Sequence, residues 1–190
     1  MDIASLWLPI LASGAAVFFA SFIAWAVSPH HHGDYQKVHD ESALDGAIKS
    51  LGLTPGSYAF PHCADSAKRK DPEFNKRWKE GPTGTIAIGG QMSMGRNMAL
   101  TFLVFLISST LIAYLATLAL PAGSDFARVF RVTGTAGILA YTISFLPNAI
   151  WFCMPKRAIA MNLIDGIVYG LITGAVFGAL WPEALGAVTG

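Results

Sequence analysis

The chain has few charged residues for its length. Asp, Glu, Lys and Arg make up 13% of its 190 residues, while 53% of the residues are hydrophobic. Soluble domains carry about 25% charged residues, so this composition argues against a protein that is soluble throughout. The 13 Lys and Arg residues nearly cancel the 12 Asp and Glu residues. Because nucleic-acid binding usually needs a basic face, this balance gives no support for it.

Common catalytic and redox signatures are also missing. Two cysteines can form one disulfide at most, which excludes a disulfide framework. There is no phosphate-binding loop, no dinucleotide fingerprint, no nucleophile elbow and no zinc-protease helix motif. All five histidines lie outside the long apolar runs, which disfavours haem bound within a membrane bundle. We therefore expect a protein that is not an enzyme and has no catalytic residues.

Four long apolar runs dominate the chain. A helix needs about 20 apolar residues to span the hydrocarbon core of a bilayer. The runs cover residues 6–27, 98–120, 128–152 and 159–181. Residues 1–5 carry no Lys or Arg, so we expect the first run to be retained rather than cleaved as a secretory signal. Since only short connections join the last three runs, the sequence predicts an all-α membrane bundle of four transmembrane helices, with neighbours antiparallel.

The segment between the first two runs, residues 28–97, is expected to form a small α+β insert outside the membrane. Asp40 can cap a helix that ends at Gly52. Asp71-Pro72-Glu73 is a typical start for a second helix, which ends before Gly81. The insert is therefore expected to be folded rather than disordered.

A β-hairpin is predicted near the end of the insert. Thr85–Ile88 and Gln91–Met94 are its expected strands, and Gly89-Gly90 is its expected turn. The predicted domains are the N-terminal tail with the first helix (1–27), the insert (28–97) and the remaining three helices (98–190).

Lys and Arg gather on one side of the predicted bundle. Nine of them lie in residues 28–97, and Lys156 and Arg157 follow the third run on the same side. The opposite side has only Arg128 and Arg131. The positive-inside rule therefore predicts that residues 28–97 are cytoplasmic and that both termini lie outside.

Small residues recur at every fourth position in two of the runs. The fourth run contains Gly166, Gly170, Gly174 and Gly178, and the first contains Ala12, Ala16, Ala20 and Ala24. Residues four apart lie on one face of a helix, and small residues let membrane helices approach closely. We expect these faces to pack the first helix against the fourth within one chain. The alternative is that the glycine face meets another subunit.

Three charged residues lie within the predicted spans. Asp165 lies about two turns into the fourth helix, with Arg157, Lys156 and the histidines after the first helix as possible partners. Arg128 and Arg131 share one helix face near the opposite membrane surface. Ionisable groups are costly in a bilayer and are usually paired. We expect structural pairs that fix helix register, because an ion pathway would need several acids.

Potential metal ligands gather after the first run. They are His30, His31, His32, His39, His62 and Cys63. The side chains of three consecutive histidines diverge, so two of them with one of the other three residues would make a tetrahedral zinc or copper site. Met92, Met94 and Met98 add thioethers that suit copper(I). The alternative is that the histidines lie at the headgroup level and the methionines fill packing gaps.

Several short segments form a recognisable set. They are Trp25–Tyr35 (WAVSPHHHGDY), Pro55–Pro61 (PGSYAFP), Gly81-Pro82, Ser93–Gly95, Asp165–Tyr169 (DGIVY) and Phe177–Pro182 (FGALWP). With these segments the chain resembles a group of bacterial four-helix inner-membrane proteins, and the resemblance extends over most of its length. The resemblance implies a multi-pass protein of the bacterial inner membrane and implies no activity. It points to the adjacent histidines and the Pro-Gly-x-Tyr turn as the first places to look for function.

These features favour a non-catalytic membrane component. We expect an accessory or structural subunit that packs against lipid and against partner membrane proteins or itself. The alternative is a membrane protein that binds copper or zinc through the histidine-rich segment. A transporter would need a polar pathway that one embedded acid does not make. An enzyme acting on lipid would have His39, Asp40 and Glu41 as acid–base groups, which are more simply a helix start.

Overall fold

The computed structural model describes residues 1–65 and 68–184 and divides into two compact units. The first unit, the bundle, comprises Met1–Tyr35, Met94–Ala149 and the described residues that follow from Met154 to position 184. The second unit, the insert, comprises Gln36–Ser93 together with Ile150–Cys153. Residues 28–35 therefore belong to the bundle, because the histidine segment packs onto the fourth span.

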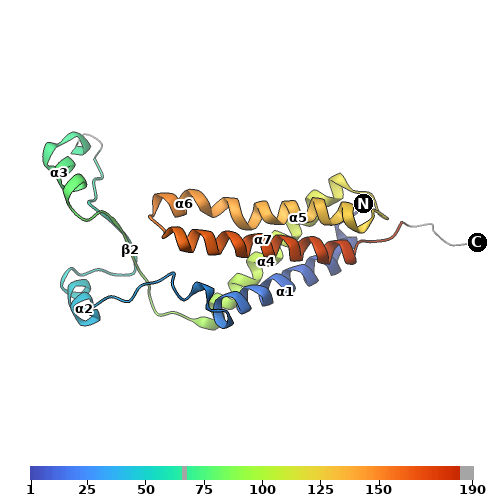
Figure 1. The fold of residues 1–190 in the computed structure, drawn as a ribbon, viewed down its shortest axis with the longest axis horizontal. Coiled ribbons are helices and arrows are strands. Elements are labelled where there is room, and N and C mark those ends of the chain that lie inside the picture. The colour runs from blue at the N-terminus through green and yellow to red at the C-terminus, as the bar shows by residue number, and fades with distance from the viewer. Residues whose placement is uncertain (66–67, 185–190) are drawn as a thin grey trace, which may run out of the picture. The chain divides into compact units, whose positions relative to one another are not determined.

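The bundle contains four helical segments that are long and apolar enough to cross a membrane (Figure 1). These candidate spans are Ile3–Val27, Met94–Ala119, Phe126–Trp151 and Lys156–Ala179. Their helices are α1 (Trp7–Phe22), α4 (Met94–Ala119), α5 (Phe126–Thr142), α6 (Leu146–Trp151) and α7 (Lys156–Ala179). The prediction of a mostly helical chain with four candidate spans is confirmed.

The third span is not one continuous α-helix. A 3-10 turn over Ile143–Phe145 separates α5 from α6. Pro147 lacks the N–H that would bond to the carbonyl of Ile143, and its ring crowds that carbonyl. The helix is therefore interrupted just before the proline, on the side of the bundle where α7 begins.

The glycine face of α7 packs on α5 of the same chain. A Cβ on Gly170 would lie 2.5 Å from the backbone nitrogen of Ile138, and a Cβ on Gly174 would lie 3.0 Å from the Cα of Gly134. Gly166 and Gly178 also lie directly against residues of α5. Only hydrogen atoms at these positions allow the two backbones to approach so closely.

The expectation that this face meets the first helix is therefore wrong. α5 has its own small residues, Gly134 and Gly137, opposite the glycines of α7, and a Cβ on Gly137 would lie 2.9 Å from the Cα of Gly170. Two matched small faces pack more closely than one small face against larger side chains. Because α5 occupies the glycine face, that face offers no surface to a second subunit.

The alanine face of α1 has a different environment. Ala24 is buried, while Ala12, Ala16 and Ala20 are half-buried. α1 packs against both α4 and α7. Ala20 and Ala24 line a groove together with residues of α7. Their small side chains therefore leave space between the helices at this level.

A hydrophobic cluster closes the bundle at the end where α1 begins and α7 finishes. Its buried residues are Leu6, Ala113, Ala116, Leu120, Val129, Phe177 and Trp181. The indole N–H of Trp181 donates to the carbonyl of Pro121 at 3.0 Å, and the amide of Gly123 donates to the carbonyl of Pro182 at 2.8 Å. These bonds tie the turn between α4 and α5 to the segment after α7.

The insert contains two short helices that begin at aspartates, as predicted. α2 covers Glu41–Ser50, and the Asp40 carboxylate accepts a hydrogen bond of 2.9 Å from the Ala43 amide. α3 covers Pro72–Glu80 and has Asp71 as its cap. Gly52 follows α2 with a φ of 62°, a conformation that glycine adopts without strain.

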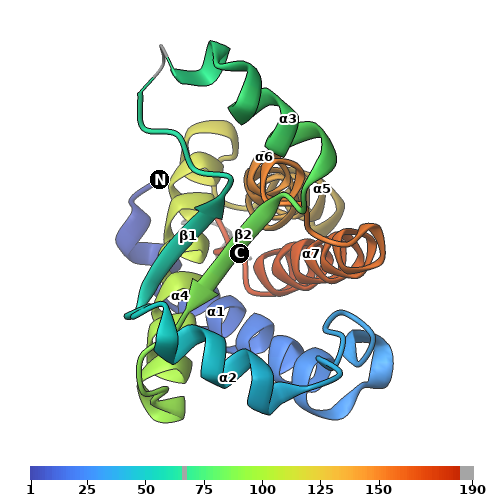
Figure 2. The ribbon, with the colours of Figure 1, turned by 90° about the vertical axis from the view of Figure 1, so that its left-hand side faces the viewer.

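The predicted hairpin within residues 85–94 is wrong in its pairing. The strand β2 covers Gly84–Ile88, but its antiparallel partner is β1, Gly56–Phe60 (Figure 2). The segment after Gly89-Gly90 forms no strand because α4 already begins at Met94. The ring of Phe60 lies over Gly84, where a Cβ would be 3.3 Å from it. Because Gly84 has no side chain, the Phe60 ring can lie over it on the sheet.

Replacing Gly170 by alanine is expected to destabilise the bundle by about 1–3 kcal/mol, because the added methyl group would force α5 and α7 apart. The measurement is the thermal unfolding midpoint of the detergent-solubilised protein. Gly95→Ala is the matched control, since no atom lies within 4 Å of a Cβ on Gly95 of α4. Its midpoint should rise slightly through helix propensity. Equal midpoints for the two variants would contradict the close α5–α7 contact.

Candidate metal-binding site

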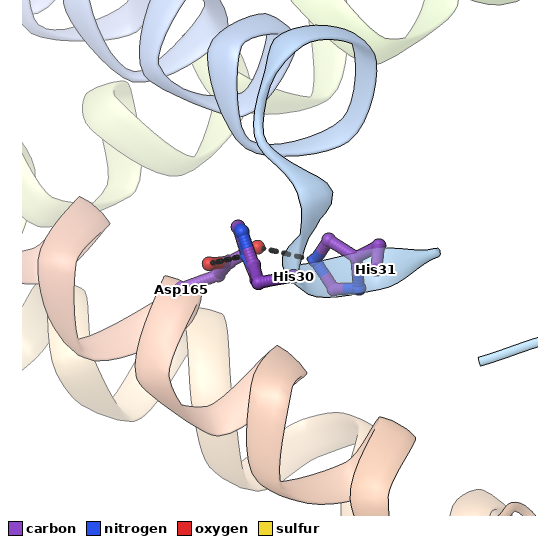
Figure 3. A group of neighbouring side chains, drawn as sticks. All are labelled: His30, His31 and Asp165. Atoms are coloured by element: carbon purple, nitrogen blue, oxygen red, sulfur yellow. Dashed lines mark hydrogen bonds and ion pairs between the residues drawn. The ribbon is translucent and has the colours of Figure 1, made fainter. Parts of the chain in front are cut away.

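Two imidazoles converge on one buried carboxylate of α7. His30 Nε2 lies 3.0 Å from one oxygen of Asp165, and His31 Nε2 lies 2.8 Å from the other (Figure 3). The hydroxyl of Tyr169, one turn further along α7, donates toward the same carboxylate at 3.4 Å. Of the partners that the sequence offered to Asp165, the histidines after α1 are the ones that it meets.

The backbone after α1 explains how adjacent histidines reach one group. α1 is followed by a π-helical turn, Ile23–Val27, in which the Ser28 amide donates to the Ile23 carbonyl at 2.8 Å. A 3-10 turn over Pro29–His31 follows and presents both rings toward α7. The indole ring of Trp25 stacks on the His31 imidazole with centroids 3.8 Å apart. A π-helical turn is a rare local geometry that occurs frequently at functional sites.

A second layer of hydrogen bonds fixes the orientation of both imidazole rings. The hydroxyl of Ser28 lies 2.6 Å from His30 Nδ1, and a carboxylate oxygen of Asp34 lies 2.6 Å from His31 Nδ1. Each ring therefore uses Nδ1 for a supporting contact and presents Nε2 to Asp165. Histidines that bind metals commonly show this division, with one nitrogen on the metal and the other on a carboxylate or similar group.

Arg157 joins the parts of this second layer. One guanidinium nitrogen donates to Asp34 at 2.7 Å, and another donates to the backbone carbonyl of His30 at 2.7 Å. Gly33 leaves the space for this side chain, since a Cβ there would lie 3.0 Å from the guanidinium. Arg157 therefore pairs with Asp34 and not with Asp165.

Two buried carboxylates determine the charge of His31. Burial by itself lowers the pKa of an imidazole, and the His31 side chain is only 3% exposed. The hydrogen bonds and charges of Asp165 and Asp34 outweigh this effect, so the pKa of His31 lies above its usual value. Because a carboxylate only accepts hydrogen bonds, a ring bonded to carboxylates through both nitrogens carries both protons. The contacts with two carboxylates therefore favour the imidazolium form of His31.

The geometry suits a single transition-metal ion. The ligand atoms of His30, His31 and Asp165 lie within 4.8 Å of one another. A tetrahedral zinc ion with bonds of about 2.0–2.2 Å separates its ligand atoms by roughly 3.3 Å. His30 and His31 contact different oxygens of Asp165, at 3.0 and 2.8 Å, so an ion bound to one oxygen and both rings requires these side chains to move apart. Three protein ligands leave one position of the tetrahedron for another molecule.

Only part of the predicted ligand set meets here. His30 and His31 are the converging pair, while His32 is exposed and lies outside the group. His39, His62 and Cys63, the expected sources of a third ligand, belong to the insert. Asp165 takes the third place, because α7 presents it at the level where the chain leaves α1. From the sequence, Asp165 was predicted to be a structural charge and was not included among the potential metal ligands.

The two arginines predicted within the third span do not contribute to the site. Arg128 and Arg131 are exposed near the start of α5 and make no ion pair within the described part of the chain. Asp125 accepts a hydrogen bond of 3.0 Å from the Arg128 amide as the cap of α5. These arginines are therefore not shown to fix helix register.

Comparison with known proteins identifies no relative. No family model matches the chain, and neither a curated protein nor a solved structure matches it. The geometry of the site is therefore the basis for the function that we propose.

Asp165→Asn is expected to destabilise the metal-free protein by about 3–5 kcal/mol, because it removes the charge partner of a buried imidazolium. The measurement is the thermal unfolding midpoint in detergent with a strong chelator present. Asp45→Asn is the control, since Asp45 is exposed on α2. A midpoint for Asp165→Asn that equals the control would argue against the buried pair.

Proposed function

We propose that the protein is a membrane-embedded metal-binding protein that holds one divalent transition-metal ion of the zinc class. The observation that carries this proposal is the convergence of His30 Nε2, His31 Nε2 and an Asp165 oxygen, with both Nδ1 atoms already engaged elsewhere. A purely structural ion pair needs one imidazole on the carboxylate. Two rings, each oriented by its own support, match the demands of a ligand set.

The chemistry of the donors selects the class of metal. Imidazole nitrogens suit zinc, copper, iron and nickel, whereas calcium and magnesium prefer oxygen ligands throughout. Two imidazoles and one carboxylate make a borderline set that binds zinc or copper(II). Methionine thioethers, which would favour copper(I), are not part of this group of three.

The charge balance also supports a cation at this place. Asp34 and Asp165 bring two buried negative charges, which Arg157 and the His31 imidazolium offset in the metal-free protein. A bound metal replaces the proton on His31 Nε2 and takes over its role toward Asp165. The site is therefore stable with either cation, and the metal competes with a proton for the same nitrogen.

The site lies at the membrane-surface end of the bundle, where α1 finishes and α7 begins. The Lys and Arg count of the loops favours the cytoplasmic side for this end. The proposed location is a multi-pass position in a bacterial inner membrane, with the ion reached from the cytoplasm. Such a location suits a protein that senses, stores or passes on a cellular metal ion.

The purified protein is expected to bind one zinc ion per chain, measured by elemental analysis after dialysis against zinc and removal of excess metal. His30→Ala, His31→Ala and Asp165→Asn should each reduce the bound zinc to a small fraction of this value. His32→Ala is the matched control, because His32 adjoins the ligands and is exposed outside the group.

Two results would overturn the proposal. One is a wild-type protein that retains no zinc or copper, and the other is equal zinc content in His31→Ala and His32→Ala. Loss of zinc in the His32→Ala variant would place the ligands elsewhere in the histidine segment.

Asp34→Asn is expected to weaken zinc binding by about 10–100-fold, because it removes the carboxylate that orients His31. The measurement is competition with a chromophoric chelator of known affinity. Asp45→Asn should leave the affinity unchanged, since Asp45 lies in the insert. Unchanged affinity in Asp34→Asn would mean that the Asp34–His31 contact serves folding alone.

A role as an accessory subunit is the second candidate, and α4 is the observation that favours it. α4 is the least buried of the four candidate spans, and its exposed residues include Leu103, Ile107, Leu111 and Leu118. Lipid or another membrane protein must cover this apolar side. Native mass spectrometry of gently extracted protein distinguishes the two, since bound polypeptides would support a subunit and a bare chain would count against it.

A further inference from the structure

A groove runs between α1 and α7 beside the candidate metal site. Its volume is about 510 Å³, and its walls include Ile23 and Ala24 on one side and Ile164 and Val168 on the other. Pockets that bind small molecules commonly enclose about 300–1,000 Å³. The groove therefore has the size of a ligand site.

The polar groups of the groove are gathered at one end. Ser28, His30 and Asp165 lie at the membrane-surface end, while Ala20 and Val168 line it further into the spans. The small side chains of Ala20 and Ala24 leave the apolar part open. A polar end at the surface and an apolar channel beneath it match the shape of a lipid, with a headgroup and a chain.

The groove reaches the candidate site through His30 and Asp165, which both line it. His30 is the ligand that both lines the groove and keeps part of its side chain exposed, at 28%. Asp165 also lines the groove but is only 10% exposed, and His31 is 3% exposed and does not line it. A molecule that completes the coordination of the ion therefore enters along the groove.

We propose that the groove binds one chain of a phospholipid whose phosphate oxygen takes the open position on the metal. This inference rests on the proposed metal site. A divalent ion together with Arg157 exceeds the charge of the two carboxylates by one, which attracts an anionic headgroup. Phosphate oxygen is also a suitable fourth ligand for a zinc-class ion.

A lipid fits better than a free anion. Inorganic phosphate would contact the metal but would leave the apolar walls of Ile23, Ile164 and Val168 uncovered. Burying an alkyl chain contributes about 0.8 kcal/mol per CH2 group, so a chain in the groove adds affinity that the free anion lacks. The lipid also reaches the groove from the bilayer without crossing water.

The test uses full-length protein loaded with cobalt(II) in detergent, because the visible spectrum of cobalt reports its ligands. Lysophosphatidic acid, a single-chain lipid with a phosphate headgroup, should change the spectrum, and inorganic phosphate at the same concentration should not. Ala20→Leu and Val168→Phe fill the groove from opposite walls and should each weaken the lipid effect about tenfold or more. Ala99→Leu, on the exposed side of α4, should behave as the wild type.

The outcomes separate this inference from the metal proposal. Cobalt that binds but whose spectrum ignores the lipid overturns the lipid inference and leaves the metal site standing. An equal response to inorganic phosphate, or an undiminished lipid response in both groove variants, overturns it as well. Cobalt that does not bind overturns both proposals, because the headgroup then has no ion to coordinate. Cobalt content in Ala20→Leu and Val168→Phe also shows that these variants are folded.

Discussion

The negative charge of Asp165 is the constraint on which this end of the bundle depends. An acid two turns inside a membrane helix is costly unless a positive group or hydrogen-bond donors meet it. Here the chain leaving α1 turns back to supply them, through a π-helical turn and a 3-10 turn that place two imidazoles on the carboxylate. The polar contact thereby determines how the end of α1 is held against α7.

The need for positive charge continues outward from Asp165. His31 bonds to Asp165 with one nitrogen and to Asp34 with the other. Arg157 pairs with Asp34, so that positive and negative groups alternate in space from Asp165 outward. Breaking any one link leaves a buried charge without its partner. In the proposed metal-bound form, the ion replaces the proton on His31 Nε2 and keeps this alternation of charges. The charges are therefore balanced by a proton on His31 or, in the proposed metal-bound form, by the ion that replaces it.

Local rules predicted much of this fold. Apolar runs located the four candidate spans, and aspartates before α2 and α3 marked their first residues. Pairings between distant segments were not predictable in the same way. The glycines of α7 predicted a close helix–helix contact. Which helix makes that contact depended on Gly134 and Gly137 of α5, which do not follow the every-fourth-residue pattern. The histidines after α1 were predicted as possible partners of Asp165, but spacing along the chain could not show that two of them converge on it from more than a hundred positions earlier.

At Gly170 and Gly137, no side chains separate the backbones of α5 and α7. Helices in such contact resist sliding, so α5 and α7 form a fixed frame. α1 meets α7 beside an open groove instead, with small side chains along it. The candidate site connects the frame, through Asp165 and Arg157, to the end of α1, through the histidines. It therefore ties the end of α1 to this frame at a place where small side chains leave the two helices less closely packed.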